Sequence, residues 1–315
     1  MKRQPMLRCV ASMAAAVLLA AAPPAGAQAP GAVKVRPIYE QGRRLRYQLT
    51  LSGATAWAPT VQGVTWGKMK TDFTFVLATK VLRTTGLQKG CCTFRLLGEH
   101  LRSEGSGANG AFGGDATRDR TRVKVKDRWQ VTVQDRSPLR KDMTLTLGPL
   151  GGFRFGTRLG GLVLYMLPHV DHRFWTLLTI APNRDVAPGD HWEQAFEFPV
   201  PGSTGKPLKL TGKWQEAGWE RYRGRSVLAL TLAAELDLKD ANVMLKNGDL
   251  VHVTSGTYKA EGKAKWDVAG GVLCHATASQ KVLIKADQPG RRALRSECES
   301  TLQLLAARKA QTGAK

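Results

Sequence analysis

The chain has 315 residues, 47 of them Lys or Arg and 25 Asp or Glu, so its formal net charge at pH 7 is +22. Hydrophobic residues make up 43% of it, and its length allows one large β domain or two smaller ones with a substantial core. A charge of this size would indicate nucleic-acid binding inside a cell. The first residues of the chain argue against that compartment.

The beginning of the chain is typical of a secretory signal peptide. Basic residues at Lys2, Arg3 and Arg8 precede an apolar run, Val10–Ala22, and a small-residue cleavage motif at 25–27. The run is too short to span a bilayer. We therefore expect residues 1–27 to be removed, and the mature protein to be periplasmic or secreted. Nucleic acid is then not an expected partner.

The stretch Arg122–Arg136 predicts one long strand with two unlike faces. Its even positions are basic or polar, and most of its odd positions are Val, with Trp129 among them. Successive side chains of a strand point to opposite sides, so one face would be basic and the other apolar. The basic face is either a binding surface for anionic partners or the solvent-exposed side of a sheet.

Similar stretches on both sides of a middle segment predict a mainly β fold. We expect long antiparallel strands in a curved sheet, a half-barrel or a sandwich, with one or two short helices in the middle at 159–167 and 174–180. The glycine-rich segment Glu104–Asp119 is predicted to be a mobile loop. The expected organisation after the signal peptide is a linker (28–40), an N-terminal β half (41–148), a helical, glycine-rich middle (149–185), a C-terminal β half (186–306) and a disordered tail (307–315).

Four cysteines follow the signal peptide, namely Cys91, Cys92, Cys274 and Cys298. A hairpin turning at 289–290 would place Cys298 opposite about Lys281, which leaves Cys274 on the order of 20 Å away, beyond disulfide reach. The pair Cys274–Cys298 is therefore disfavoured. A bridge from Cys91 or Cys92 and free buried thiols both stay open.

Motifs for catalysis or metal binding are weak. His169 and His172 could supply metal ligands, but no third ligand at a suitable spacing accompanies them. Cys274 and His275 are adjacent and would point apart on a strand, so they do not form a catalytic pair. We expect a non-catalytic protein without metal or cofactor. A secreted hydrolase remains a third hypothesis, because acidic or His residues distant in sequence could converge.

Tryptophans in the predicted strands suggest a site for an apolar ligand. They could be ordinary core, or they could line an apolar concavity covered by the middle segment. On the second interpretation the protein binds a lipid or another apolar ligand. The alternative function is an envelope structural protein that binds acidic polymers through basic strand faces. The ligand-lining residues of the hypothesis are Trp129, Leu162, Leu164, Met166, Trp192, Trp214 and Trp266.

Three short motifs resemble a group of secreted bacterial β-rich proteins of unassigned function. They are Gly-Arg-Arg-Leu-Arg-Tyr-Gln-Leu from Gly42, Ala-Pro-Gly-Asp-His-Trp from Ala187, and the strand and tight turn that run from Gly256 to Gly271. The fold of that group is similar to the lipoprotein-carrier (LolA/LolB-like) half-barrel. The resemblance covers about residues 40–290. It implies a curved antiparallel sheet around a hydrophobic cavity, with helices as a lid. The sequence does not determine the oligomeric state.

Overall fold

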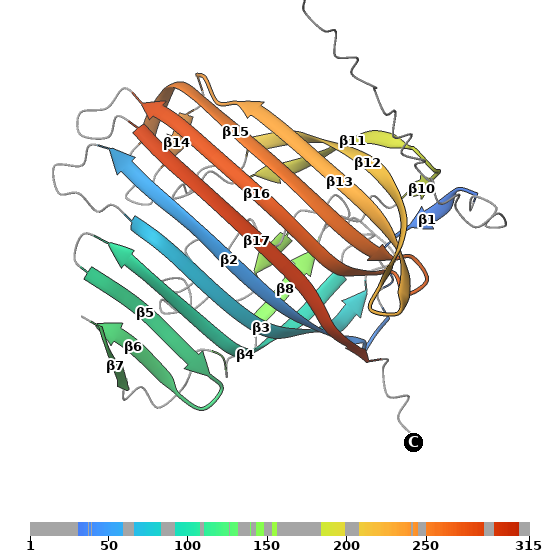
Figure 1. The fold of residues 1–315 in the computed structure, drawn as a ribbon, viewed down its shortest axis with the longest axis horizontal. Helices are drawn as coiled ribbons and strands as arrows, with labels where there is room; N and C mark the ends of the chain where they lie inside the picture. The colour runs from blue at the N-terminus through green and yellow to red at the C-terminus, as the bar shows by residue number, and fades with distance from the viewer. Residues whose placement is uncertain are drawn as a thin grey trace, which may run out of the picture. The chain divides into compact units, whose positions relative to one another are not determined.

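Long antiparallel strands account for most of the described structure (Figure 1). In the computed structural model these strands belong to one compact unit, Gly31–Lys315. The structure describes residues 31–36, 38, 40–58, 66–82, 92–107, 110–125, 127–131, 139, 143–147, 153–155, 184–198, 208–240, 242–244, 250–286 and 293–308.

The main sheet follows a single path of neighbouring strands, in the order β11-β12-β13-β15-β16-β17-β2-β3-β4-β5-β6-β7. Along this path each described pair is antiparallel, and the terminal strands β11 and β7 do not pair with each other among the described residues. The bounds are β2 Arg44–Ala58, β3 Trp66–Leu82, β4 Cys92–Gly107, β5 Gly110–Thr117, β6 Thr121–Val125, β7 Arg128–Val131, β11 His191–Phe198, β12 Leu208–Tyr222, β13 Arg225–Asp237, β15 Leu250–Asp267, β16 Val272–Ala286 and β17 Ala293–Arg308.

Shorter strands attach to this sheet or form a separate pair. β14 (Asn242–Met244) pairs with β15, while β8 (Met143–Leu147) pairs with β4 and with β9 (Phe153–Phe155). β1 (Val33–Val35) and β10 (Arg184–Val186) form a two-stranded sheet. Val35 and Val186 are nevertheless buried in the same hydrophobic cluster as the main sheet.

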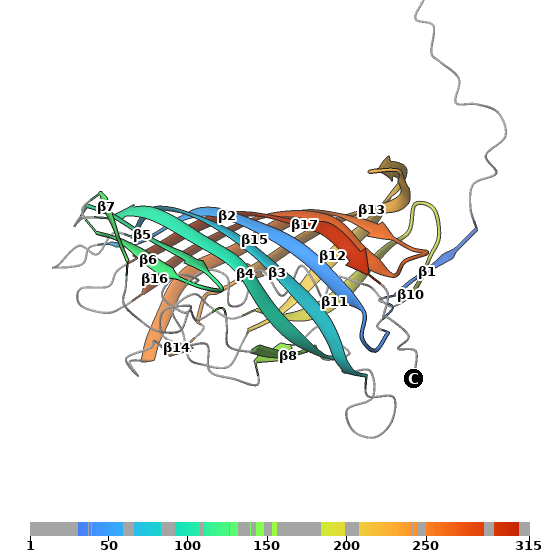
Figure 2. The same cartoon turned by 90° about the horizontal axis from the view of Figure 1, so that it is seen from below.

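The two predicted β halves form one continuous sheet. β17, near the end of the chain, pairs along its length with β2, so that Leu302 lies opposite Leu49 and Cys298 lies opposite Gly53. β17 ends at Arg308, two residues inside the segment expected to be a tail. The prediction of a mainly β, antiparallel fold is confirmed, and the long strands twist and curve together (Figure 2).

Burial alternates along the strands and defines two faces of the sheet. On the face that we call the apolar face, Leu49, Phe75, Leu101 and Ala276 are each at most 1% exposed. The alternate residues form the opposite side, the polar face, which carries for example Thr277. This is the period of two expected of a sheet with one buried side.

The glycine-rich segment predicted as a mobile loop consists largely of strand. β4 continues to Gly107 and β5 begins at Gly110, with Arg102 opposite Asp115 and Glu104 opposite Gly113. The loop prediction was wrong because it used composition alone. The glycines lie in strands, and neighbouring strands supply their hydrogen bonds and side-chain contacts.

The predicted long strand at Arg122–Arg136 is also corrected. Asp127 has a positive φ of 65° and forms a turn, so the described part of this segment is the hairpin of β6 and β7. The turn changes which side chains share a face. Trp129 lies opposite Lys124, on the polar face, rather than beside Val123.

The predicted helices at 159–167 and 174–180 lie outside the described residues. The part of the chain that the structure describes contains no α-helix. In that part there is also no helix of the length and apolarity needed to cross a membrane.

The turn that leads into β11 is held by Glu216 of β12. The Glu216 carboxylate, 7% exposed, accepts hydrogen bonds from the backbone N–H of Gly189 at 2.9 Å and of Gly218 at 2.8 Å. Both glycines have positive φ, 78° and 98°, which a side chain would disfavour. Glu216 therefore fixes where β11 starts, and with it the position of Trp192.

The hairpin geometry agrees with the disulfide argument. Gln280 stands opposite Cys298, one residue from the predicted Lys281, and Cys274 is a buried free thiol. Cys91 lies outside the described residues, so its pairing is still a prediction.

Candidate functional site

Trp192 and Trp214 form a stacked pair at one end of the apolar face. They are cross-strand partners on β11 and β12, with ring centroids 6.1 Å apart and planes 5° from parallel. They are 8% and 4% exposed. Two sequence-predicted residues are thus brought together, with the offset parallel geometry that aromatic pairs favour.

Trp266 lies on the same face, opposite Leu228. It is 2% exposed. On β13 its partner Leu228 lies four residues from Leu232, the partner of Trp214, which corresponds to about 13 Å along the strand. The structure therefore places three of the four predicted tryptophans on the apolar face, but not in one contact cluster.

These three indoles share an unusual feature. The Nε1 atoms of Trp192, Trp214 and Trp266 are buried, and none of the described residues accepts a hydrogen bond from them. An indole nitrogen can only donate, and a buried donor without an acceptor costs about 1–3 kcal/mol. The apolar face thus holds three unsatisfied donors.

A cation lies beside the first of these donors. The guanidinium carbon of Arg184 is 5.3 Å from the ring centre of Trp192, and its side chain is 45% exposed. Its ion pair with Asp190 is long, at 3.8 Å. Arg184 and Trp192 therefore present a positive charge and an N–H donor at the same end of the apolar face.

Between the tryptophan pair and β3, the apolar face carries very small side chains. We call this the small-residue band. It crosses β12, β13, β15, β16, β17 and β2 in two neighbouring cross-strand rows. The first row is Gly212, Ala234, Ala260, Gln280, Cys298 and Gly53; the second continues the row of Trp214 and Leu232 with Gly262, Ala278 and Ser300.

Gln280 is the one long polar side chain of the band. It is 7% exposed, and its buried Oε1 accepts no hydrogen bond from any described residue. The apolar face therefore also offers an unsatisfied acceptor. Gln280 interrupts the apolar positions of its alternating strand, between Ala278 and Val282, and this break is the signal by which the sequence could have indicated it.

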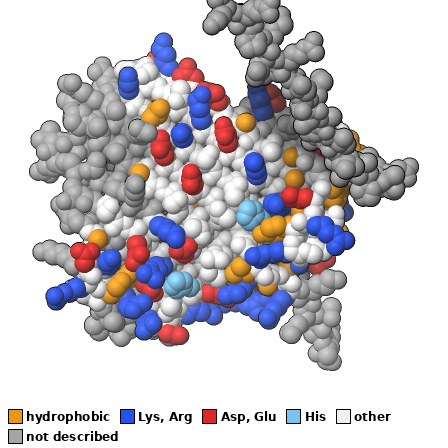
Figure 3. Space-filling view, viewed as in Figure 1, with side chains coloured by type: hydrophobic (Ala, Val, Ile, Leu, Met, Phe, Trp, Pro, Cys, Tyr) orange, Lys and Arg blue, Asp and Glu red, His pale blue; other side chains and the backbone are white. Residues whose placement is uncertain are grey.

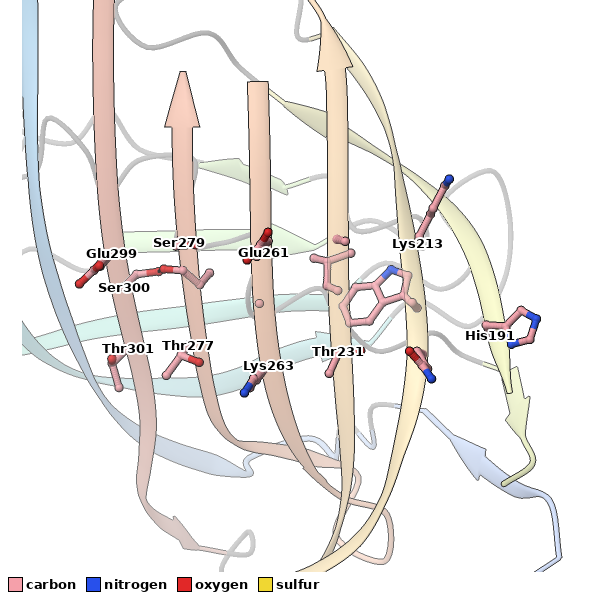
Figure 4. A pocket seen from close by; sticks show the side chains of 16 residues that line it. His191, Lys213, Thr231, Glu261, Lys263, Thr277, Ser279, Glu299, Ser300 and Thr301 are labelled. Atoms are coloured by element: carbon pink, nitrogen blue, oxygen red, sulfur yellow. The ribbon is translucent and has the colours of Figure 1, made fainter. Parts of the chain in front are cut away.

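The polar face carries an open groove with a volume of about 700 Å³ (Figure 4). Its walls are exposed or half-exposed side chains from β11 to β17, and the backbone between them forms its floor. A neighbouring groove of about 730 Å³ shares Glu299 with it and reaches β4. The labelled walls in Figure 4 include Lys213, Thr231, Glu261, Lys263, Thr277, Ser279, Glu299 and Thr301.

Charges of the two signs are interleaved on the polar face. Lys259 pairs with Glu235 at 2.9 Å, and Arg46 pairs with Glu99 at 2.7 Å. Figure 3 shows blue and red side chains scattered among uncharged ones over this face. Its described charges do not form one basic surface.

Trp129 belongs to this polar face and is corrected as a ligand-lining residue. Its ring lies under two guanidinium groups, Arg122 at 5.6 Å and Arg102 at 5.8 Å from the ring centre. Arg122 also donates a hydrogen bond to its cross-strand neighbour Asp115 at 2.8 Å. The hairpin turn at Asp127 is the reason for the change of face.

The described residues among the other predicted groups do not form a reactive site. Leu162, Leu164 and Met166, as well as His169 and His172, lie outside the described residues. Burial and the nearby Asp267 raise the pKa of the Cys274 thiol, which favours its protonated form. Among the described residues no group of three or more His, Cys, Asp and Glu is arranged to hold a metal ion.

No family model matches the chain, and no curated protein matches it. Among solved structures, it is similar to lipovitellin, in a structure of its lipid–protein interactions, with a TM-score of 0.39 and 10% identity over 88% of this chain and 26% of that one. It is also similar to DynF from the dynemicin biosynthesis pathway of Micromonospora chersina (TM-score 0.24, 7% identity, 94% and 92% coverage). A third is the β domain of the Bordetella autotransporter Brka (TM-score 0.16, 10% identity, 82% and 98% coverage). These low TM-scores do not establish a shared fold, and the resemblance to lipoprotein carriers stays a prediction.

Proposed function

We propose that the protein is an extracytoplasmic, non-catalytic binding protein for an amphiphilic lipid, which lies against the apolar face of the sheet. The observation that carries the proposal is the pair of buried indole N–H groups of Trp192 and Trp214, for which the described residues supply no acceptor. A carboxylate or carbonyl oxygen of a ligand would satisfy such a donor, and the desolvation cost of the empty state would be recovered.

The arrangement at Trp192 and Trp214 suits the head of the lipid. Arg184 supplies a positive charge beside Trp192, and the indole N–H groups supply donors, which together favour a carboxylate over a neutral group. The hydrocarbon chain would gain about 25 cal/mol for each Å² of apolar surface removed from water.

The alternative, binding of acidic polymers through basic strand faces, receives less support. It needs a surface of one sign, whereas Lys259, Lys265 and Arg122 on the polar face each pair with a carboxylate. Interleaved charges of this kind give weak long-range attraction for a polyanion.

The proposal is tested with Trp214→Phe, which keeps an aromatic ring and removes only the N–H donor. Loss of one hydrogen bond of about 1 kcal/mol is expected to weaken oleic-acid binding about fivefold, measured by isothermal titration calorimetry. Trp129→Phe, on the polar face, is the matched control and is expected to bind as the unmodified protein does. Absence of saturable oleic-acid binding by the unmodified protein, or equal binding by both variants, would contradict the proposal.

A further inference from the structure

The groove of about 700 Å³ on the polar face runs across the strands rather than along them (Figure 4). Its walls belong to two neighbouring cross-strand rows of side chains, and the backbone of the small-residue band, for example at Gly262 and Ala278, forms the floor between them. A long, narrow molecule can therefore lie in the groove and contact every strand from β12 to β17.

Long and short side chains alternate along one of these rows. Lys213, Glu261 and Glu299 stand on β12, β15 and β17, whereas Ala233 and Ser279 stand on the strands between them. The long side chains thus recur at every second strand, a spacing of about 10 Å. The other row consists mainly of hydroxyl-bearing residues, and its members from β12 to β17 are Gln215, Thr231, Lys263, Thr277 and Thr301.

The charged groups in the walls of the groove are unpaired, unlike other charges on the polar face. The side chains of Lys213, Glu261, Lys263 and Glu299 form no ion pair or hydrogen bond with another described residue. Lys265, on the same strand as Lys263, is by contrast paired with a carboxylate at 2.8 Å. The groove therefore offers free donors, free acceptors and hydroxyl groups, which can do both, within one surface.

We infer that this groove binds a neutral, β-1,4-linked glycan chain, which lies across the strands with one hexose over each strand. A sugar hydroxyl group both donates and accepts hydrogen bonds, so ammonium, carboxylate and threonine groups can all bind it. A polymer of one charge would instead be repelled by part of these walls. The site is separate from the one proposed for the lipid, because it lies on the opposite face of the sheet.

The spacing of the long side chains favours this linkage. In an extended β-1,4-linked chain each hexose advances the chain by nearly one strand spacing, about 5 Å, and successive hexoses are turned over. The same hydroxyl groups therefore return to the same side at every second hexose, as the long side chains do at every second strand. An α-1,4-linked chain coils and loses this match. An extended peptide repeats after about 7 Å, which is too short.

Cellohexaose and maltohexaose test the inference, because these two glucose hexasaccharides differ only in their linkage. Titrations of the unmodified protein, followed by saturation-transfer NMR, are expected to show saturable binding of cellohexaose and an affinity for maltohexaose that is at least about tenfold lower. Absence of cellohexaose binding, or equal affinity for the two sugars, would overturn the inference. Either result leaves the proposed lipid binding intact, because that is measured with oleic acid.

A pair of variants tests whether the sugar lies in the groove. Ala233→Lys places a long side chain between Lys213 and Glu261 and gives Glu261 an ion-pair partner, so the cellohexaose affinity is expected to fall about tenfold. Ala195→Lys, at an exposed position of β11 outside the groove, is the matched control and is expected to bind as the unmodified protein does. Equal cellohexaose affinity of the two variants would overturn the assignment to the groove.

Discussion

Gly113 lies beneath Trp129 on the polar face of the sheet. A Cβ atom added at Gly113 would be 3.3 Å from Cη2 of Trp129 and 2.9 Å from the carbonyl oxygen of Ser103. The indole thus covers a glycine that would otherwise weaken its strand, an arrangement that stabilises glycines near sheet edges. This packing explains why a glycine-rich sequence is extended and paired here.

Replacement of Gly113 tests that account. Gly113→Ala is expected to lower the free energy of unfolding by about 1–3 kcal/mol, because the new methyl group must displace the backbone of β4 or the indole. Urea denaturation followed by circular dichroism measures the change. Gly31→Ala, where nothing lies within 4 Å of the added atom, is the control. Equal stability of the two variants would show that Trp129 does not pack on Gly113.

Sequence alternation predicted which residues share a face of a strand, but not which residues of different strands share a row. Trp192 and Trp214 could be expected on a buried side, whereas their contact depends on the register of β11 with β12. The small-residue band is harder to foresee still, because its members come from six strands.

Among the elements, the hairpin of β12 and β13 places its tip beside the polar side of β16. The Tyr222 ring lies 5.5 Å from that of His275, and Lys265 forms an ion pair with Glu220 at 2.8 Å. Arg223, in the turn, donates to the side-chain oxygen of Gln303 on β17. His275 therefore faces two cations, Lys265 and Arg223, and one carboxylate, Glu220.

This surrounding makes the hairpin sensitive to acid. Burial, followed by Lys265 and Arg223, lowers the pKa of His275 below its ordinary value of 6.5, while Glu220 opposes the shift. At a pH above the pKa values of both the folded and the unfolded state, the imidazole is neutral in either state. It then contributes nothing to the pH dependence of the free energy of unfolding. As pH falls below 6.5 the unfolded chain takes up the proton first, so stability is lost until the folded pKa is passed.

His275→Gln is expected to lose less stability than the unmodified protein between about pH 7.5 and about pH 5, since it has no imidazole to protonate. Urea denaturation at the two pH values measures the difference. His191→Gln, at an exposed position of β11, should behave as the unmodified protein does. A variant at 275 with the same pH dependence as the unmodified protein would contradict the assigned role.

Element boundaries show where sequence patterns are informative. Alternation predicts strands at Met143–Leu147, Gly271–Ala286 and Ala293–Leu304. β8, β16 and β17 begin within a residue of these positions, because alternation and turn residues agree there. The segment at Arg122–Arg136 kept its alternation through a turn made by Asp127, a non-glycine residue with positive φ. Asp127 interrupts the apolar positions of the alternation and is a residue type common in turns, but the prediction did not use this break. The predicted strand was therefore too long, and Trp129 was given the wrong face.

At the scale of the whole molecule, the strands before and after the middle segment join through β17 and β2 into one sheet. The apolar face of that sheet therefore gathers residues from nearly the full length of the described chain. The chain has a net charge of +22, but on the polar face acidic and basic side chains alternate and pair with each other. We therefore assign the proposed function to the apolar face.

The central claim is that this face holds an amphiphilic lipid. Native mass spectrometry of the protein, purified without detergent from the cell that produces it, tests this most directly. We expect a mass above that of the polypeptide, lost on extraction with organic solvent, and an amphiphilic lipid in the extract. A mass equal to that of the polypeptide alone, with no lipid in the extract, would contradict it.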